Sequence, residues 1–177
     1  MTTAKTPKTA ARKSADASID AIKLLTEDHK EVKALFKQYD KLVKDEADDE
    51  DKQQIALEIC LKLTVHATVE EEIFYPAARE ALGDEADLVD EADVEHASAK
   101  ELIAQIEASS PAEDDHYDAR VKVLGEYIDH HVKEEEGQMF SKLKKSELDL
   151  DALGDDLAAR KEELMAELGV ENEDAEA

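Results

Sequence analysis

The chain has 177 residues, with 47 acidic and 22 basic side chains and a formal net charge of −25. A body this acidic repels phosphate groups and so is no platform for nucleic acid, and its single cysteine excludes an intrachain disulfide and a thiolate metal cage. Glycine and proline are scarce and 39% of the residues are charged, which is typical of an all-α helical bundle rather than a turn-rich β-protein.

The two ends of the chain differ from the body that they flank. Residues 1–17 carry four basic side chains and almost no apolar side chain larger than alanine, which predicts a flexible tail. The alternative is a weak electrostatic arm for nucleic acid or anionic lipid. Residues 170–177 are acidic, and we expect them to be frayed. No stretch approaches the ~18 apolar residues that span a bilayer, and no secretory signal is evident, so the sequence predicts a cytoplasmic protein without membrane contact.

Apolar residues at steps of three and four predict two helices in the first half of the chain. The first begins near residue 16, with Asp16 or Ser18 as its N-cap, and the acidic run at 45–51 indicates an exposed connection. Pro76 is expected to bend or restart the second helix, and Gly83 to end it. The two inner faces consist of Ile22, Leu25, His29, Val32, Phe36 and Tyr39, and of Ile55, Ile59, Leu63, His66, Glu70 and Ile73.

The second half of the chain predicts two more long helices and a shorter one. Ser110, Pro111 and Glu113 have the spacing of a capping box, which predicts that the fourth helix starts at Pro111. The C-terminal helix is expected from about Asp155 to Leu168, closed by Gly169. The inner faces consist of Val89, Ala92, His96, Ala99, Ile103 and Ile106, of Val121, Leu124, Ile128, His131, Glu135 and Met139, and of Leu157, Leu164, Met165 and Leu168.

Four amphipathic segments joined by short links describe an antiparallel, up-down four-helix bundle. We place this bundle at residues 18–146 and the extra helix, packed on the bundle, at 147–169. No feature of the sequence demands a second copy of the chain, so we expect a monomer.

Each of the four inner faces of the bundle contains one histidine, and two of these histidines precede a glutamate by four residues, on the same helical face. A lone histidine on such a face is more often a hydrogen-bonded core residue, and a lone buried carboxylate is costly. Here that interpretation must apply to four histidines and two glutamates at once, whereas two metal ions would satisfy all six groups. Imidazole with carboxylate suits iron, manganese or zinc. The six residues are His29, His66, Glu70, His96, His131 and Glu135.

The sequence also repeats itself. Asp28-His29 is echoed 67 residues later by Glu95-His96, and His66-x-x-x-Glu70-Glu71 is echoed 65 residues later by His131-x-x-x-Glu135-Glu136. Two copies of one hairpin, related by a pseudo-twofold axis, would offer each ion two histidines and two bridging carboxylates.

Two other histidines are weaker candidates. His130 also precedes a glutamate at i+4, but only His131 keeps the Glu-Glu pair and the following aromatic residue at the offsets of the repeat. His116 lies outside the inner face and is expected at the surface. Glu113-x-x-His116 is the only Glu-x-x-His in the chain and lies at a helix start, which disfavours the ferritin-like di-iron pattern. Cys60 is expected to be a small core or flank residue.

The order His…His-x-x-x-Glu…His…His-x-x-x-Glu resembles the hemerythrin-like, or HHE cation-binding, family over roughly residues 19–145. The resemblance implies an up-down bundle that holds two Fe ions in an oxo- or hydroxo-bridged di-iron centre. Its ligands, by position in the motif, would be His29, His66, Glu70, His96, His131 and Glu135. The oxygen-carrying members have five histidines, one Glu and one Asp. The chain is instead similar to the symmetric subset, some members of which are linked to iron or oxygen sensing and to peroxide decomposition.

This ligand set leaves one open position on each iron for O₂, H₂O₂ or NO. The leading hypothesis is a di-iron protein that binds or reduces O₂ or H₂O₂, with catalase- or peroxidase-like turnover left open. The alternatives are a non-enzymatic iron or oxygen sensor or iron-binding module, a reversible O₂ carrier, and a helical stress protein that binds no metal. Both irons are expected to have similar surroundings. Tyr39 and Tyr127 are the only candidate aromatic hydroxyls, with core packing as their alternative role.

Overall fold

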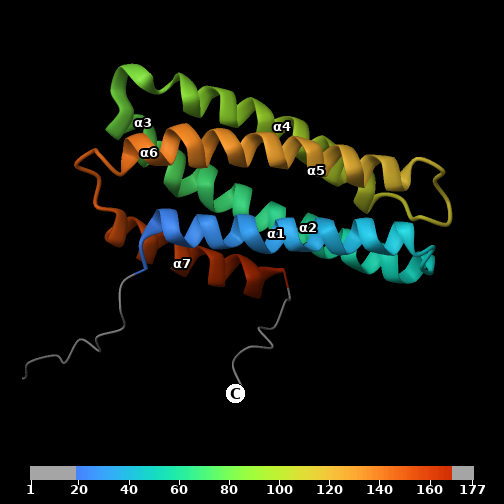
Figure 1. Cartoon of the computed structure of the whole chain (residues 1–177). Helices are drawn as coiled ribbons and strands as arrows, with labels where there is room; N and C mark the ends of the chain where they lie inside the picture. Colours follow the sequence, from blue (N-terminus) through green and yellow to red (C-terminus); the bar gives the residue numbers. More distant parts are fainter. Residues whose placement is uncertain (1–18, 169–177) are drawn as a thin grey trace, which may run out of the picture.

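Figure 1 shows the computed structural model of the protein, which describes residues 19–168. Four long helical segments lie side by side and alternate in direction, which confirms the predicted all-α bundle. No helix among the described residues is long and apolar enough to cross a membrane. The predicted tails at 1–17 and 170–177, and Gly169, which is predicted to close the last helix, lie outside the described range. The helices of the bundle are α1 (Ala21–Lys44), α2 (Asp49–Val69), α3 (Tyr75–Leu82), α4 (Asp87–Glu107), α5 (Tyr117–Glu134) and α6 (Phe140–Leu143).

One π-helical turn interrupts the second and the fourth segment at the same place in the repeat. The turn η1 (Glu70–Phe74) joins α2 to α3, and the turn η3 (Glu135–Met139) joins α5 to α6. In each turn the carbonyl of the opening glutamate accepts a hydrogen bond from the backbone N–H five residues later. Such turns are rare and are frequent at functional sites.

The wider turn changes which residues face the core. Phe74, at i+4 from the opening glutamate, is fully buried, whereas the predicted Ile73 is only partly buried. Pro76 follows the first π turn, in agreement with the expected bend, but Ser141 occupies the matching position after the second. The proline is therefore not required for the turn.

The ends of the first hairpin have clear local causes. α1 begins after Asp20, whose carboxylate accepts a 2.9 Å hydrogen bond from the N–H of Lys23. The predicted caps Asp16 and Ser18 lie outside the described residues. Gly83 follows α3 with φ of +56°, a conformation that favours glycine, so the predicted end of this segment is confirmed.

The start of the fourth segment differs from the prediction. α5 begins at Tyr117, and the residues from Pro111 onward form turns instead of its first helical turns. The Ser110 hydroxyl donates a 3.0 Å hydrogen bond to the Glu113 carboxylate, rather than accepting one from a backbone N–H. The capping-box spacing is present, but its side chains bond to each other and cap no helix.

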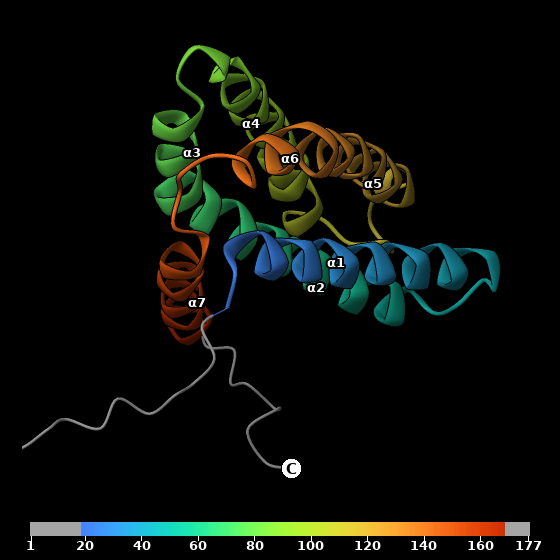
Figure 2. The same ribbon diagram turned by 60° about the vertical axis from the view of Figure 1, so that its left-hand side comes forward.

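The C-terminal helix α7 (Leu150–Glu167) packs against α1, α2 and η1, on the side of the first hairpin (Figure 2). It begins five residues before the predicted Asp155, because the Asp149 carboxylate caps it by accepting the N–H of Ala152 at 3.0 Å. Leu157 and Leu164 are buried as predicted, whereas Leu168 is half exposed.

The contact between α7 and the start of α1 depends on a glycine. A Cβ atom at Gly154 would lie 1.7 Å from the carbonyl oxygen of Ile19. No side chain larger than a hydrogen fits there without displacing α7 from the bundle.

The apolar core forms two clusters, one toward each end of the bundle. On α1, for example, Ile22 and Leu25 belong to one cluster and Val32 to the other, with His29 between them. On α4, likewise, Val89 and Ala92 belong to the first cluster and Ala99 to the second, with His96 between them. A layer of buried polar side chains therefore crosses the bundle between the two clusters.

Candidate metal centre

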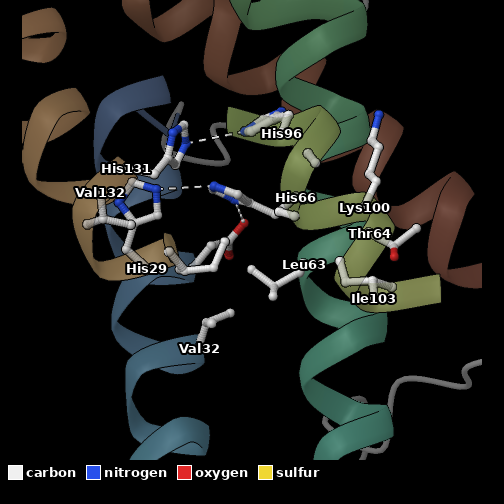
Figure 3. Close-up of a pocket in the computed structure, with 14 residues that line it drawn as sticks. His29, Val32, Leu63, Thr64, His66, His96, Lys100, Ile103, His131 and Val132 are labelled. Carbon is white, nitrogen blue, oxygen red and sulfur yellow. Dashed lines mark hydrogen bonds and ion pairs between the residues drawn. The ribbon is translucent and has the colours of Figure 1, made fainter. Parts of the chain in front are cut away.

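Four histidines, one from each segment, form the middle of this polar layer (Figure 3). All four are buried, and they face each other in two pairs. The Nε2 atoms of His29 and His66 lie 3.1 Å apart, and those of His96 and His131 lie 3.2 Å apart. The structure therefore brings together all four histidines singled out in the sequence.

Two glutamates lie between the histidine pairs. Glu70 Oε1 is 3.2 Å from His66 Nε2, and Glu70 Oε2 is 3.4 Å from His96 Nε2. Glu135 Oε2 is 3.4 Å from His29 Nε2 and 3.6 Å from His131 Nε2. Each carboxylate thus contacts one histidine of either pair. We call these six side chains the centre.

A second set of four carboxylates, the supporting carboxylates, accepts a hydrogen bond from the outer nitrogen of each histidine. A carboxylate only accepts, so each Nδ1 donates its proton outward, and each Nε2 faces the centre as the atom that a metal ion would take. Each supporting carboxylate neighbours a ligand candidate of the repeat in sequence. The pairs are Asp28 with His66 (3.3 Å), Glu71 with His96 (3.0 Å), Glu95 with His131 (2.7 Å) and Glu136 with His29 (2.9 Å).

The buried carboxylates of the centre would be stabilised by bound cations. Both oxygens of Glu70, and Oε2 of Glu135, are buried without a hydrogen-bond partner among the described residues. Four Nε2 atoms and two carboxylates converge on the same space, so the centre is rich in groups that can donate an electron pair to a metal ion. Metal ions fit such a donor set, and carboxylate-supported imidazoles are a common way to orient metal ligands. Within the centre, two groups of side chains have the spacing of a metal site: His29, His66, Glu70 and Glu135, and Glu70, His96 and His131.

The same charges shift the pKa values of the centre. Burial alone would lower the pKa of His66, but Glu70 and Asp28 outweigh it and raise that pKa to about 10. Burial alone would raise the pKa of Glu70, yet His66 and His96 hold it well below its usual range. Glu70 is therefore ionised, and a metal ion that binds here replaces protons held by the imidazoles.

One aromatic hydroxyl lies within the centre, and it is neither of the two expected. The hydroxyl of Tyr75 donates a 3.0 Å hydrogen bond to Glu135 Oε1 and lies 3.1 Å from His96 Nε2. Burial, followed by the charges of Glu70 and Glu135, raises the pKa of Tyr75 well above 10. Its match in the repeat, Phe140, stacks on His29 and has no hydroxyl. The two halves therefore differ here, contrary to the expectation of similar surroundings.

The other aromatic and thiol candidates lie away from the centre. The Tyr39 hydroxyl donates a 2.6 Å hydrogen bond to Asp118, and Tyr127 is largely exposed. Cys60 is fully buried in an apolar cluster, and burial raises the pKa of its thiol to about 12. Tyr75 could have been found in the sequence, because it is the aromatic residue at the same offset as Phe140 in the repeat.

Two further histidines lie at the surface. The side chain of His116 is 81% exposed and that of His130 is 62% exposed. His131, one residue further on, is buried in the centre. The helical face and the offset of the repeat thus identified which of the two adjacent histidines points inward.

A small cavity of about 30 Å³ adjoins the four histidines on one side. Its remaining wall is mainly apolar and includes Val32, Leu63, Ile103 and Val132, which Figure 3 places around the imidazoles. A cavity of this size holds a molecule of one to three heavy atoms.

Comparisons with known proteins agree with this architecture. The family model of the hemerythrin HHE cation-binding domain matches residues 20–168. The chain is 33% identical over 119 residues to a protein named DNA nickase from Nostoc sp.; the match covers 66% of this chain and only 31% of that protein. Among solved structures, the chain is similar to a hemerythrin HHE cation-binding domain-containing protein from Mycobacterium kansasii. The TM-score is 0.68 at 23% identity, with 84% of this chain and 89% of that chain covered.

Proposed function

Because the chain belongs to the hemerythrin HHE cation-binding family, we propose that its centre holds two iron ions and binds or reduces O₂ or H₂O₂. The observation that carries the proposal is the position of Glu70 and Glu135, each in contact with both histidine pairs. One ion beside each pair would share these two carboxylates as bridges. Each pair would then supply two imidazoles to its own ion.

The choice of iron rests on the donor types and on the chemistry they permit. Imidazole and carboxylate donors without thiolate suit iron. Two adjacent irons supply two-electron redox chemistry, which matches the O₂/peroxide couple. The cavity of about 30 Å³ beside the histidines suits O₂, NO or H₂O₂ and is too small for an organic substrate.

The protein's own side chains would orient the ligands and keep water away. The supporting carboxylates hold each imidazole by Nδ1, so that Nε2 keeps its direction toward the centre. The apolar cavity wall excludes bulk water. Tyr75 donates its one hydroxyl proton to Glu135 Oε1, and its oxygen lies beside His96 Nε2. A small oxygen ligand could accept this proton only by replacing Glu135 as the acceptor.

Peroxide disproportionation is the turnover that we propose for this centre. Two H₂O₂ give one O₂ and two H₂O: one peroxide loses two electrons and two protons, and the other gains them. The reaction needs no outside reductant or proton source.

The test is to purify the full chain, count iron per chain, and record its absorption before and after O₂ and H₂O₂. We expect one iron for each histidine pair, O₂ evolution from H₂O₂ that is abolished in Glu135→Ala, and a poorly stable O₂ adduct. Absence of iron from protein made with iron available would refute the proposal. A long-lived, reversible O₂ complex without peroxide turnover would favour an oxygen carrier.

A non-enzymatic iron sensor is the second candidate, and one contact favours it. Asp28, which supports His66, forms an ion pair with Lys161 of α7. Loss of metal would free His66 and Asp28 to move. The ion pair between Asp28 and Lys161 would then change, and with it the packing of α7 on the bundle. A partner protein could detect that change. Turnover distinguishes the two, because a sensor changes shape without consuming peroxide.

DNA nicking, the activity named for the longer relative, is not proposed for this chain. The match spans less than a third of that protein. A net charge of −25 also repels a phosphate backbone.

A further inference from the structure

The repeat gives the centre two equivalent outer faces, one behind His66 and one behind His131. α7 covers the first face, where Leu157 and Leu164 pack in one apolar cluster with Val65 and Val69 of α2. On this face Asp28 forms an ion pair with Lys161. Apolar side chains and the ammonium group of Lys161 therefore cover the face behind His66.

The second face has different residues at the matching positions. An offset of 65 residues relates Val65 to His130 and Val69 to Glu134. The valines are buried, whereas the side chains of His130 and Glu134 are 62% and 37% exposed. Glu95 corresponds to Asp28, and its neighbour is the imidazole of His130 rather than a lysine.

These three residues have the spacing of a cation site. His130 Nε2 lies 3.5 Å from Glu95 Oε1 and 3.7 Å from Glu134 Oε1. One ligand atom from each of Glu95, His130 and Glu134 lies within 4.8 Å of the others. We call these residues the outer group.

A small crevice lies between two carboxylates of the outer group, Glu95 and Glu134, and the centre. Its walls include Glu95 and Glu134 on the outer side and His131 and Glu135 on the inner side, and its volume is about 10 Å³. Glu135 is 2% exposed and its Oε2 atom has no hydrogen-bond partner among the described residues. Glu95 contacts both the outer group and the centre, since its other oxygen accepts the Nδ1–H of His131 at 2.7 Å. Carboxylate side chains thus line the crevice from its outer side to the centre.

We propose that the outer group is a divalent-cation site through which Fe²⁺ reaches the buried centre. Carboxylate and imidazole ligands at a partly exposed position bind such an ion weakly and exchange it readily. The excess of acidic residues attracts cations to the surface. The ion then passes from Glu134 and His130 to His131 and Glu135 without change of oxidation state. This role rests on the proposed binding of metal by the centre.

The test measures loading rate and final content separately. The metal-free full chain is mixed anaerobically with Fe²⁺, and uptake is followed over time in wild type, His130→Gln and Glu134→Gln. We expect initial uptake to be slower by about 10-fold or more in both variants, because the path is interrupted, with the same amount of tightly bound iron per chain at equilibrium. Glu101→Gln is the matched control for Glu134→Gln, since it removes an equal charge from an exposed position on α4.

A second measurement detects the outer site directly. With excess Co²⁺, wild type should bind one weak ion more than His130→Gln does. Wild-type uptake rates in both variants would overturn the proposal, and so would a lower final iron content, which would make these residues part of the centre. If wild type bound no metal at all, the proposed function itself would be refuted, and the outer group would have no metal to pass to the centre.

Discussion

The hairpin of α1 and α2 and the hairpin of α4 and α5 present the same ligand types to the centre but differ in their surroundings. Behind the first lie α7, two buried valines and Lys161; behind the second lie exposed His130 and Glu134. The first supplies a hydroxyl from Tyr75, where the second supplies the ring of Phe140. Apart from Tyr75 and Phe140, the positions that face inward are thus alike, and the positions that face outward are not.

This difference follows from how the polar layer is satisfied. Glu71 of the first hairpin supports His96 of the second, and Glu136 of the second supports His29 of the first. A change at one inward position leaves a buried group of the other hairpin without its partner, at a cost of about 1–3 kcal/mol. Outward positions have no such reciprocal contact, so the two copies are free to diverge there.

The largest expected effect comes from removing a carboxylate shared by both histidine pairs. Glu70→Ala should remove most bound metal, and so should His66→Ala, because each leaves other buried ligands unsatisfied. Loss of one partner of a buried charged pair costs about 3–5 kcal/mol. For a chain of this length that lowers the melting temperature by roughly 6–20 °C. Metal analysis and calorimetry measure both effects.

The two hairpins can be compared directly with the same assay. Glu135→Ala should match Glu70→Ala, because each carboxylate contacts both pairs. His116→Ala is the control and should change neither metal content nor melting temperature. Wild-type metal content in His66→Ala would contradict the assignment of the centre.

The register of the second hairpin gives the next largest effect. His131→Ala should lose metal at equilibrium, because His131 is buried with Nε2 toward the centre. His130→Ala should keep its metal at equilibrium, since its side chain points to solvent. Metal analysis after long incubation checks this pair. The reverse outcome would mean that α5 is rotated by one residue.

Tyr75→Phe tests the hydroxyl that distinguishes the halves, because it makes position 75 equal to Phe140. We expect metal content to remain and peroxide turnover to fall roughly 10- to 100-fold, the range for loss of a hydrogen bond to a charged group. O₂ evolution from H₂O₂ is the measurement. Tyr39→Phe is the control, since that hydroxyl bonds Asp118 far from the centre. Equal loss in both variants would show a general effect of lost hydroxyls.

The smallest effect concerns the helix that covers only the first hairpin. Gly154→Ala should destabilise the protein by about 1–3 kcal/mol, because the new Cβ overlaps the carbonyl oxygen of Ile19. Gly137→Ala is the matched control: a Cβ there meets nothing within 4 Å, so its unfolding free energy should be unchanged or slightly higher. Chemical denaturation of both variants measures the difference. Equal stability of the two would mean that α7 is not seated against α1 as described.

The sequence by itself determined the four helical segments and the six side chains of the centre. Apolar periodicity specifies which face of a helix points inward, and His29, His66, His96 and His131 all lie on such faces. The repeat added the register, which separated His131 from His130. Both signals are local, because they depend only on residues within one helix or one hairpin.

Only the tertiary structure decided which residues meet across the bundle. Periodicity identifies an inward face without identifying the helix opposite, so the pairing of Glu71 with His96 was not predictable. The repeat marks the position of Tyr75 by its match with Phe140, but not its contact with Glu135: the π turn shifts the residues after Glu70 on the helix surface, and a regular helical repeat does not anticipate that shift. The side of the bundle on which α7 packs also depends on tertiary contacts. Gly154 of α7 lies directly against the backbone of Ile19, just before the start of α1. Contacts between distant segments set these features, and no short stretch of sequence contains them.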